Sequence, residues 1–568
     1  MYIASVPNRN SPPAILLRES YRENGKVKSR TLANLSKLPA ESIAVLKRSL
    51  KGEQLVPAAE AFEAVASRHH GHVHAVLLAM RQLRFVELIA TRASHERNLV
   101  VAMAIARILE PDSKLATTRW WHVTTLPSLL EVGDADEDEL YQALDWLLER
   151  QERIEANLAA RHLNDDGLAL YDLSSSYFEG VTCPLAFFGH NRDGKKGKLQ
   201  VNYGLLTNPC GIPVAVSVFE GNTGDTKTLL PQLTKVRDQF ALERFVLVGD
   251  RGMITQKQVS ALHEIDGVDW IAALRPEAIK KLLDSGALQM DLFDQRNLFE
   301  LTHPDFPGER LVACRNPDLA KRRAEKRKSL LEATAKELHK VRAMVERGRL
   351  HGEDAIGVRI GKVVNKYKVA KHFKLDIRDQ SFDFEIDEDR VAAEVALDGV
   401  YVVRTSLSEQ RMKADDAVRS YKLLSQVERA FRSMKSIDLK VRPIHHRLER
   451  RVRAHIFLCM LAYYVQWHMV EAWRPLLFCD EDQQAKASRD PVAPAQRSEP
   501  ALRKVHARIL DDGTEVHSFR TLLASLSAIV RNVCQVPDSG PDAPTFEVVT
   551  TPDAKQQHAY NLLETIQL

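Results

Sequence analysis

The run Phe245-Val246-Leu247-Val248-Gly249-Asp250 is a short apolar segment that ends in a glycine and an aspartate. Such a run is typical of a buried strand, and a carboxylate directly after it stands at the carboxyl edge of a sheet, where α/β sites form. Leu168-Ala169-Leu170-Tyr171-Asp172 is a second run of this kind. Taken singly, either aspartate also fits a turn or a helix N-cap. Together they predict that Asp172 and Asp250 share one edge of a sheet.

A third acidic residue lies far downstream, in the segment from Asp415 to Ser436. This segment contains neither proline nor glycine, and its apolar residues recur at helical spacing. They are Leu423, Val427, Ala430, Phe431 and Met434. Glu428 borders this apolar stripe, so we expect a single helix that aims Glu428 inward over the sheet. Two carboxylates at strand ends and one on a helix can hold a pair of divalent cations against a phosphodiester.

The order of elements between these acids predicts the fold class. The expected strands are 168–178, 198–207, 212–219, 244–248 and 270–274, with helices at 226–240 and 255–265. The tight turn Asn208-Pro209-Cys210-Gly211 joins the second strand to the third, so the first three strands form an antiparallel meander. Three antiparallel strands followed by β-α-β predict an α/β protein with an RNase H-like catalytic core, a mixed five-stranded sheet with flanking helices.

These features resemble the DDE transposases of bacterial insertion sequences. In one large subgroup the last acid lies in a Tyr-x2-Arg-x3-Glu-x6-Lys block, and Tyr421, Glu428 and Lys435 have those spacings here. Leu424 stands where the subgroup has arginine, which bears on a DNA contact and leaves the acids intact. The stretches 221–228 and 249–253 also resemble family loops. The resemblance covers residues 160–275 and 390–470, and the amino-terminal region more loosely.

The resemblance implies a transposase that acts on the terminal inverted repeats of its own element. Asp172, Asp250 and Glu428 would be the catalytic residues and the ligands of two Mg²⁺ ions, for which Mn²⁺ can substitute. One strand would be cut at each end, and the freed 3′ hydroxyl would attack the opposite strand or target DNA. The implied DNA-contacting residues are Tyr421, Lys435, Arg432, Asn222 and Arg251. Double-stranded DNA would be the partner, bound by a homodimer.

Two alternatives remain open. A metal-dependent nuclease on the same fold would cut DNA without joining it, but the large insertion and the extra amino-terminal regions favour a protein that holds specific ends. A non-catalytic DNA-binding derivative is kept open by Leu424, whereas the intact acidic triad argues against it. The chain has no Gly-rich phosphate loop. We therefore expect no nucleotide cofactor, which agrees with transesterification, a reaction that conserves the number of phosphodiester bonds.

Outside the core we expect four further regions. Residues 1–40 should form a basic β-hairpin, because 14–23 and 26–35 flank Asn24-Gly25, and this ribbon either enters a DNA groove or packs on the body. Residues 41–160 should form a helical, end-binding domain, with the clearest helices at 84–109 and 137–163. Core parts at 161–275 and 411–478 would flank an insertion domain at 276–410. Residues 479–568 should form a linker, centred on 480–500, and an accessory segment, with a strand at 501–510 and a helix at 519–531.

The insertion should combine helix and strand. A long helix is expected at 318–348, and its first turns carry a run of basic residues that we expect to contact DNA phosphates, although a solvated face is the alternative. Expected strands are 356–363, 382–386 and 399–403. A second basic cluster follows the Glu428 helix and consists of Lys440, Arg442, Arg447, Arg450, Arg451 and Arg453. Because the net charge is only +4, DNA binding must rely on such clusters.

The cellular setting follows from what the sequence lacks. The six cysteines are scattered and form no CxxC pair, which indicates neither a zinc site nor a disulfide framework. The stretch from Met1 to Pro13 is polar and does not fit a signal peptide. The most apolar stretch, 455–468, is too short to span a bilayer and predicts a core helix. We therefore expect a cytoplasmic, nucleoid-associated bacterial protein with no membrane contact.

Overall fold

The computed structural model describes residues 1–9, 11–53, 61–294, 297–482, 489–493, 496–537, 540 and 542–568. The described chain divides into two compact units. The smaller unit combines residues 1–68 with 530–550, and the larger combines 69–529 with 551–568. The expected linker at 480–500 includes 483–488 and 494–495, which lie outside the described residues. The smaller unit thus extends past the expected hairpin boundary at residue 40 and includes part of the carboxyl-terminal region.

The smaller unit contains two three-stranded sheets. In the first, β1 (Tyr2–Val6), β2 (Ala14–Glu23) and β3 (Lys26–Asn34) are antiparallel in that order, followed by α1 (Ala40–Leu50). The predicted hairpin is confirmed, because Asn24 and Gly25 both have positive φ (53° and 75°) and Glu23 pairs with Lys26. The second sheet has the order β16 (Phe546–Val549), β15 (Val530–Gln535), β4 (Glu63–His69). Sequence analysis did not predict β1, β4, β15 or β16, and it placed Val530 and Arg531 of β15 at the end of a helix.

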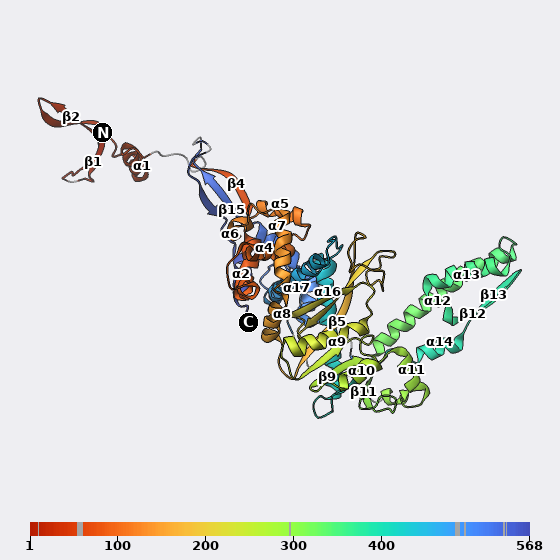
Figure 1. Cartoon of the computed structure of the whole chain (residues 1–568). Helices are drawn as coiled ribbons and strands as arrows, with labels where there is room; N and C mark the ends of the chain where they lie inside the picture. The colour runs from red at the N-terminus through yellow and green to blue at the C-terminus, as the bar shows by residue number, and fades with distance from the viewer. Residues whose placement is uncertain are drawn as a thin grey trace. The chain divides into compact units, whose positions relative to one another are not determined.

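The larger unit is built on an eight-stranded mixed sheet of order β10-β11-β14-β9-β8-β5-β6-β7 (Figure 1). The strands are β5 (Gly167–Tyr177), β6 (Gln200–Thr207), β7 (Pro213–Glu220), β8 (Phe245–Gly249), β9 (Val268–Ala273), β10 (Leu298–Leu301), β11 (Arg310–Arg315) and β14 (Val400–Thr405). Strands β5, β6 and β7 form the predicted antiparallel meander. Strand β8 runs parallel to β5, and β9 runs parallel to β8. The five strands therefore have the predicted order and directions.

The predicted size of the sheet was wrong. Strands β14, β11 and β10, which belong to the expected insertion, continue the sheet beyond β9. Val403 of β14 pairs with Ala273 of β9, and both residues are buried. Without β14, the apolar strand β9 would leave unpaired backbone groups at an exposed edge. The insertion thus completes the sheet as well as interrupting the chain.

Helices α15 (Ala414–Lys422) and α16 (Leu424–Arg432) replace the predicted single helix 415–436, which is interrupted at Leu423. A π-helical turn from Ser433 to Ile437 follows. On the other side of the meander, α9 (Asp225–Thr234) follows β7, and α10 (Gln256–His263) follows β8 (Figure 1). Helix α16 packs on β5, and α15 packs on β8 and β9. The carboxyl ends of β8 and β9 therefore meet the helix pair that carries Glu428.

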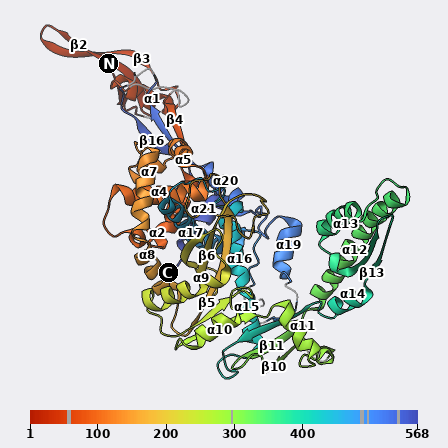
Figure 2. The same ribbon diagram turned by 45° about the vertical axis from the view of Figure 1, so that its right-hand side comes forward.

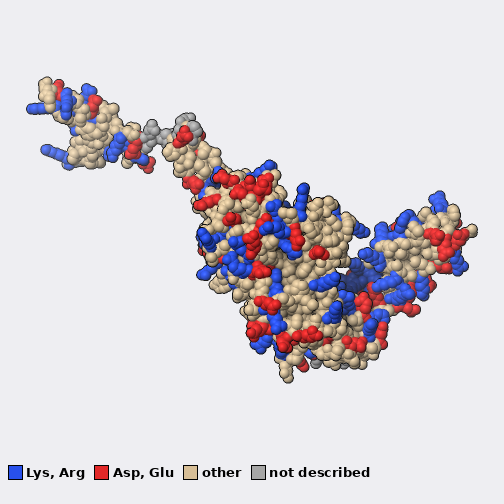
Figure 3. Space-filling model, viewed as in Figure 1, with Lys and Arg blue, Asp and Glu red and all other residues tan. Residues whose placement is uncertain are grey.

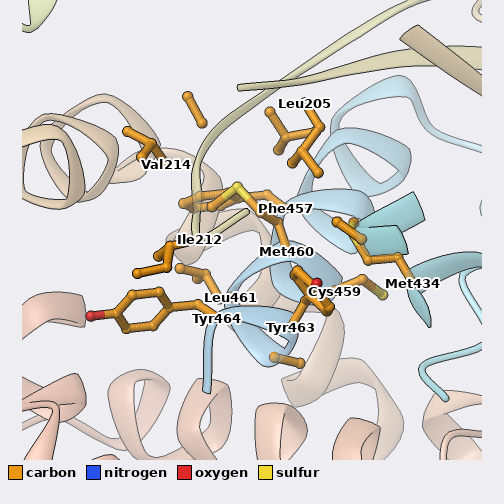
Figure 4. Packing of buried hydrophobic residues seen from close by; sticks show 14 of the residues in the cluster. Leu205, Ile212, Val214, Met434, Phe457, Cys459, Met460, Leu461, Tyr463 and Tyr464 are labelled. Carbon is orange, nitrogen blue, oxygen red and sulfur yellow. The ribbon is translucent and has the colours of Figure 1, made fainter. Parts of the chain in front are cut away.

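The buried helix predicted around 455–468 is confirmed as α17 (Glu449–Ala472). Its side chains, including Phe457 and Met460, pack with Leu205 of β6 and Val214 of β7 (Figure 4). Met434, at the end of the Glu428 helix segment, joins the same cluster. This core ties the position of that segment to the sheet. Among the described residues, no helix is long and apolar enough to cross a membrane.

The rest of the insertion has a core of its own (Figure 2). Its elements are α12 (Pro317–Glu346), α13 (Glu353–Tyr367), β12 (Phe373–Arg378), β13 (Ser381–Ile386) and α14 (Glu388–Val395), whereas α11 (Pro276–Asp284) packs with β11 and β14. The expected long helix and the strands near 382–386 and 399–403 are confirmed as α12, β13 and β14. The strand predicted at 356–363 was wrong: Ile356, Ile360 and Val364 are buried at four-residue spacing on α13. The apolar residues in this stretch match both the two-residue period of a strand and the four-residue spacing of a helix.

Three other helix assignments need correction. The predicted helix 84–109 is two helices, α3 (Phe85–Ile89) and α4 (His95–Leu109), because the Ser94 hydroxyl caps α4 by accepting from Arg97 N. The predicted helix 137–163 divides at Arg150 into α7 (Glu137–Leu148) and α8 (Gln151–His162). The strand expected at 501–510 is mostly helix α19 (Glu499–Ala507), whereas the helix expected after it is confirmed as α20 (Phe519–Ser527).

Candidate active site

Asp172 and Asp250 lie side by side where β8 ends. Tyr171 of β5 pairs with Gly249, the last residue of β8, so the next residue of each segment is one of the two aspartates. The strand predicted at 168–178 is confirmed as β5, so Asp172 lies within its strand and not at the strand's end, where the apolar run alone would place it. Strand β5 continues to Tyr177 because, beyond the end of its parallel partner, it still pairs with the longer β6. Asp172 thus lies in the middle of β5, level with the carboxyl end of β8.

Glu428 reaches this position from α16, which packs on β5. Burial raises the pKa of Asp172 to about 7, and the charges of Asp250 and Glu428 add to this rise. A hydrogen bond from Leu173 N and the charge of Arg192 oppose it. Asp250 and Glu428 are therefore near enough to Asp172 for their charges to act on it. Glu428 and Asp250 are solvent-exposed, so Glu428 faces the open side of the site and is not buried over the sheet.

Tyr421, which the sequence suggested as a DNA contact, contacts the carboxylate of Asp250 in this structure. Its hydroxyl donates to Asp250 Oδ1 at 3.3 Å, and burial together with the charge of Asp250 raises the pKa of Tyr421. The same Oδ1 accepts from Arg251 N at 2.7 Å. Both hydrogen bonds hold one oxygen of Asp250 and leave the other oxygen for a ligand. Tyr421 is thus placed to orient Asp250.

Lys435 is buried and pairs with Asp193 at 2.9 Å. Arg442 forms an ion pair with the same carboxylate, whose second oxygen accepts from Tyr177 N at 3.0 Å. Burial lowers the pKa of Lys435, and the Asp193 charge opposes that shift. The family-type lysine therefore ties the end of the Glu428 segment to the loop between β5 and β6.

The other residues proposed from the sequence to contact DNA are exposed. Arg432 lies on α16, Asn222 follows β7, and Arg251 directly follows Asp250. Arg251 also lines a groove of about 990 Å³ with basic residues of the insertion, among them Lys326 of α12 and Lys371. Lysine and arginine side chains are prominent on the insertion (Figure 3). Leu424, by contrast, is buried in the main core, so this chain uses the position of the subgroup's arginine for packing.

Sequence reasoning missed Arg192 and Asp225. Arg192 Nη2 donates to Asp225 Oδ1 at 2.6 Å, and the Arg192 charge acts on Asp172. Arg192 lies in the loop between β5 and β6, within Gly189-His190-Asn191-Arg192-Asp193-Gly194. This polar, glycine-bounded stretch predicts only a loop. Its conformation, which no spacing rule supplies, brings Arg192 to the acids.

The donor set fits a hard divalent cation. Carboxylate oxygens are the ligands that Mg²⁺ prefers, and burial together with the charges of Asp250 and Glu428 raises the pKa of Asp172, a shift that a bound cation would oppose. Among the described residues, no group of three or more His, Cys, Asp or Glu side chains is close enough to enclose one metal ion. Asp172 and Asp250 are therefore adjacent, and Glu428 acts on Asp172 through its charge without closing a three-carboxylate cage in this structure.

Comparisons with known proteins were made on the whole chain. The family described as "Transposase DDE domain" matches residues 178–465, just over half of the chain. The family described as "IS1634 family transposase, N-terminal domain" matches residues 3–60. No curated protein matches significantly. Among solved structures, a piggyBac transposase synaptic complex with hairpin DNA is similar at 8% identity and a TM-score of 0.34, over 80% of this chain and 79% of that one. A Mos1 transposase paired-end complex with the left transposon end gives 12% identity and a TM-score of 0.14, over 36% of this chain and 76% of that one.

Proposed function

Because the chain belongs to the DDE transposases of insertion sequences, we propose that it binds the terminal inverted repeats of its own element and cuts and joins DNA there. The observation that carries this proposal is that Asp172 and Asp250 follow paired residues of β5 and β8 and that the charges of Asp250 and Glu428 both act on Asp172. The strand order of β5 to β9 supports an RNase H-like core as the scaffold. DNA is the substrate that connects the acidic site with the exposed basic side chains around it.

Transposases of this family generally depend on divalent metal ions. Asp172, Asp250 and Glu428 are the residues that would hold them, and Mg²⁺ is the ion that their oxygen donors fit best. Two bound ions would activate the attacking oxygen and stabilise the leaving oxygen of the phosphodiester. Asp172 must be ionised to act as a ligand, and a pKa of about 7 means that a nearby cation decides its charge at neutral pH.

The protein's own residues would orient the acids and the DNA. Tyr421 and the backbone N–H of Arg251 fix one oxygen of Asp250, so its other oxygen points to the ligand in a set direction. Arg192 places a guanidinium beside Asp172, where it can neutralise charge on the reacting phosphate. Lys435 would act indirectly, by holding Asp193.

We propose direct DNA contacts for Arg251, Arg432 and Asn222, which are exposed near the acids. The groove between Arg251 and the insertion would hold flanking DNA, because its basic lining attracts phosphates. Cleavage at both element ends requires two sites of this kind. We therefore propose a homodimer as the smallest DNA-bound assembly, in the cytoplasm of the host bacterium.

Nicking of a supercoiled plasmid that carries both element ends tests the proposal. We expect the purified protein to nick the plasmid with Mg²⁺ and not with EDTA, and to leave a plasmid without the ends intact. A second assay offers pre-cut ends and a target plasmid, and joined products are expected. Nicking without joining would identify a nuclease on this fold. Specific binding of the ends without any Mg²⁺- or Mn²⁺-dependent nicking would indicate the non-catalytic derivative.

A further inference from the structure

A pocket of about 730 Å³ opens in the larger unit away from the acidic site. It lies between α4, α5 (Lys114–Trp120), the start of α17 and the segment that precedes α17. Its cationic lining residues are Arg107, Lys114, Lys440, Arg442, Arg447 and Arg451. Asp112 is the one acidic residue among the described residues that line it. The pocket is therefore strongly positive.

Two of these cations lie at the buried base of the pocket. Lys114 is 4% exposed and Arg107 is 6% exposed. The Arg107 guanidinium donates to backbone carbonyls, at 3.1 Å to Asp112 O and 3.5 Å to Leu439 O, and to no carboxylate among the described residues. Within the same part of the chain, no protein partner accepts from the Lys114 ammonium. Burying such charges without an anion is costly, so the pocket is built for one.

Of the other cations that line the pocket, only some form ion pairs within the protein. Arg442 pairs with Asp193, and Arg451 stacks on Tyr141 while it lies 3.8 Å from Asp145. The described structure gives Lys440 and Arg447 no acidic partner. The Asp112 carboxylate accepts from Ser113 N at 2.7 Å, which turns it toward the start of α5. An anion entering the pocket would thus meet uncommitted positive charge at both base and rim.

The pocket's position relates it to the acidic site. Phe178, just after β5, forms a β-bridge with Ile444 in the segment that lines the pocket. Asp172 lies six residues earlier in the same extended strand, which corresponds to about 20 Å at 3.3 Å per residue. DNA rises 3.4 Å per base pair, so about six base pairs span this distance. The segment that lines the pocket therefore meets the chain about 20 Å from Asp172 along β5, so a flanking phosphate and not the scissile one is the expected ligand.

We propose that this pocket binds a backbone phosphate of the transposon-end DNA, about six base pairs from the cleaved bond. Lys114 and Arg107 contact the phosphate oxygens at the base, and Lys440 and Arg447 close the rim. The proposal rests on the proposed function for the identity of the DNA. It adds a contact from the helical region, through α4 and α5, that sets the register of the duplex on the catalytic sheet.

Binding of a fluorescent end duplex, measured by anisotropy in EDTA at several salt concentrations, tests this contact. Lys114→Gln and Arg447→Gln should each weaken binding about fivefold at 0.15 M salt and reduce the slope of log K against log salt by about 0.9, the counterion release of one phosphate. Arg244→Gln is the matched control, because Arg244 is exposed at the opposite end of β8 and pairs with Asp165. It should leave the dissociation constant and the slope unchanged. At saturating DNA, the control Arg244→Gln should also nick at the wild-type rate.

A phosphate scan locates the contact. Single methylphosphonates, each removing one phosphate charge, should weaken wild-type binding at one position about six base pairs from the cleavage site, and that effect should be lost in Lys114→Gln. Wild-type affinity and salt slope in both Lys114→Gln and Arg447→Gln would overturn the proposal. A second outcome would also overturn the proposal: inorganic phosphate raises the melting temperature of the wild type but not of the pocket variants, while the wild type and the variants bind DNA equally well. The pocket would then hold a free anion. Arg447 is exposed, so its variant reports even if the Lys114 variant misfolds. Absence of nicking by the wild type would count against the proposed function and leave these binding results interpretable.

Discussion

The acidic site around Asp172 and the basic pocket around Lys114 each gather charge of one sign around a desolvated group, the half-buried Asp172 and the buried Lys114. Burial is the first cause in each case: it raises the pKa of Asp172 to about 7 and lowers the pKa of Lys114 to about 7. Like charges strengthen both shifts, Asp250 at the first site and Arg107 at the second. The two regions differ in sign and therefore in ligand. One is complementary to cations and the other to phosphate.

Buried charges elsewhere in the larger unit are neutralised within the protein. Arg404 of β14 pairs with Glu309 at 2.5 Å, and both side chains are almost fully buried. Arg327 of α12 pairs with Asp398 at 2.6 Å, again with both partners buried. These ion pairs connect elements of the insertion. These two pairs contrast with Lys114 and Arg107, which are buried without an acidic partner among the described residues and beside a pocket that a ligand can enter.

The largest effect should separate catalysis from binding. Asp172→Asn, Asp250→Asn and Glu428→Gln should each reduce the nicking rate by about a thousandfold or more, because each removes a group that acts on the transition state. The dissociation constant of the end duplex in EDTA should stay near the wild-type value. Nicking rates at saturating DNA and anisotropy titrations measure the two quantities.

The pocket variant Lys114→Gln provides the reverse comparison, with weakened binding and a loss of nicking rate at saturation that is far smaller than in the triad variants. Equal loss of DNA binding in all three triad variants would contradict the division of labour between the two regions. Retention of nicking by Glu428→Gln alone would remove the helix-borne acid from the site.

The next effect concerns a neutralised pair. Arg404→Met should lower the free energy of unfolding by about 3–5 kcal/mol, because it leaves Glu309 buried without a partner. The double variant Arg404→Met/Glu309→Leu should recover most of this loss. Lys280→Met removes a cation from an exposed pair with Asp284 and should change stability by less than about 1 kcal/mol. Denaturant titrations compare the variants, and equal stability of the two single variants would contradict the role of burial.

The sequence predicted the order of β5 to β9 because each strand is a local apolar run bounded by turn residues. It did not predict that β14, β11 and β10 join them, since pairing between residue 273 and residue 403 depends on an edge that forms only in the folded sheet. The strand predicted at 356–363 failed for a local reason. Ile356 and Ile360 match both the two-residue and the four-residue period, and packing on α12 selects the helix.

The three acids were predictable because each follows or borders a recognisable sequence pattern. The basic residues near the two sites, Arg192 and Lys114, have no such pattern. Arg192 reaches Asp172 through the conformation of a polar loop. Lys114 follows Ser113, which caps α5, and so has the sequence context of an ordinary exposed first-turn lysine. Only the packing of α5 beside the segment before α17 buries it. Leu424 shows the opposite case, because its buried position explains the departure from the family motif.

A smaller effect should appear as a pH-dependent stability of the metal-free protein. The folded-state pKa of Asp172 lies above its usual value, so its contribution to stability falls as pH rises from about 4 to about 7. Asp172→Asn cannot ionise, and in EDTA at pH 8 it should be more stable than the wild type by at most about 4 kcal/mol, which corresponds to about three pKa units. At pH 4 the difference should vanish. Thermal melts measure both conditions, with Asp305→Asn at an exposed carboxylate as the control.

With added Mg²⁺ at pH 8, the wild type should become more stable than Asp172→Asn, because only the wild type has a carboxylate at position 172 that can bind the ion. A wild-type protein whose melting temperature ignores both pH and Mg²⁺ in this range would show that Asp172 carries no uncompensated charge.

The smallest effect concerns the opposite charge. Lys114 has a folded-state pKa of about 7, below its usual value, so its burial cost is full below pH 7 and fades as pH rises and the ammonium deprotonates. A DNA phosphate favours the charged ammonium form of Lys114, so DNA binding takes up a proton. The affinity of the wild type for the end duplex should therefore fall between pH 7 and pH 9. The decrease should be about fivefold at most, the value of one phosphate contact. Burial lowers the pKa of His446 to about 3 and that of His455 well below its usual range, and burial raises the pKa of Cys459, so these neighbours stay neutral at pH 7. Lys114→Gln should therefore bind with an affinity that no longer changes over this range, whereas Arg447→Gln should retain the full decline from a weaker starting value. Anisotropy titrations at constant ionic strength measure the three curves, and an equal decline in Lys114→Gln would place the titrating group elsewhere and break the symmetry between the two buried charges.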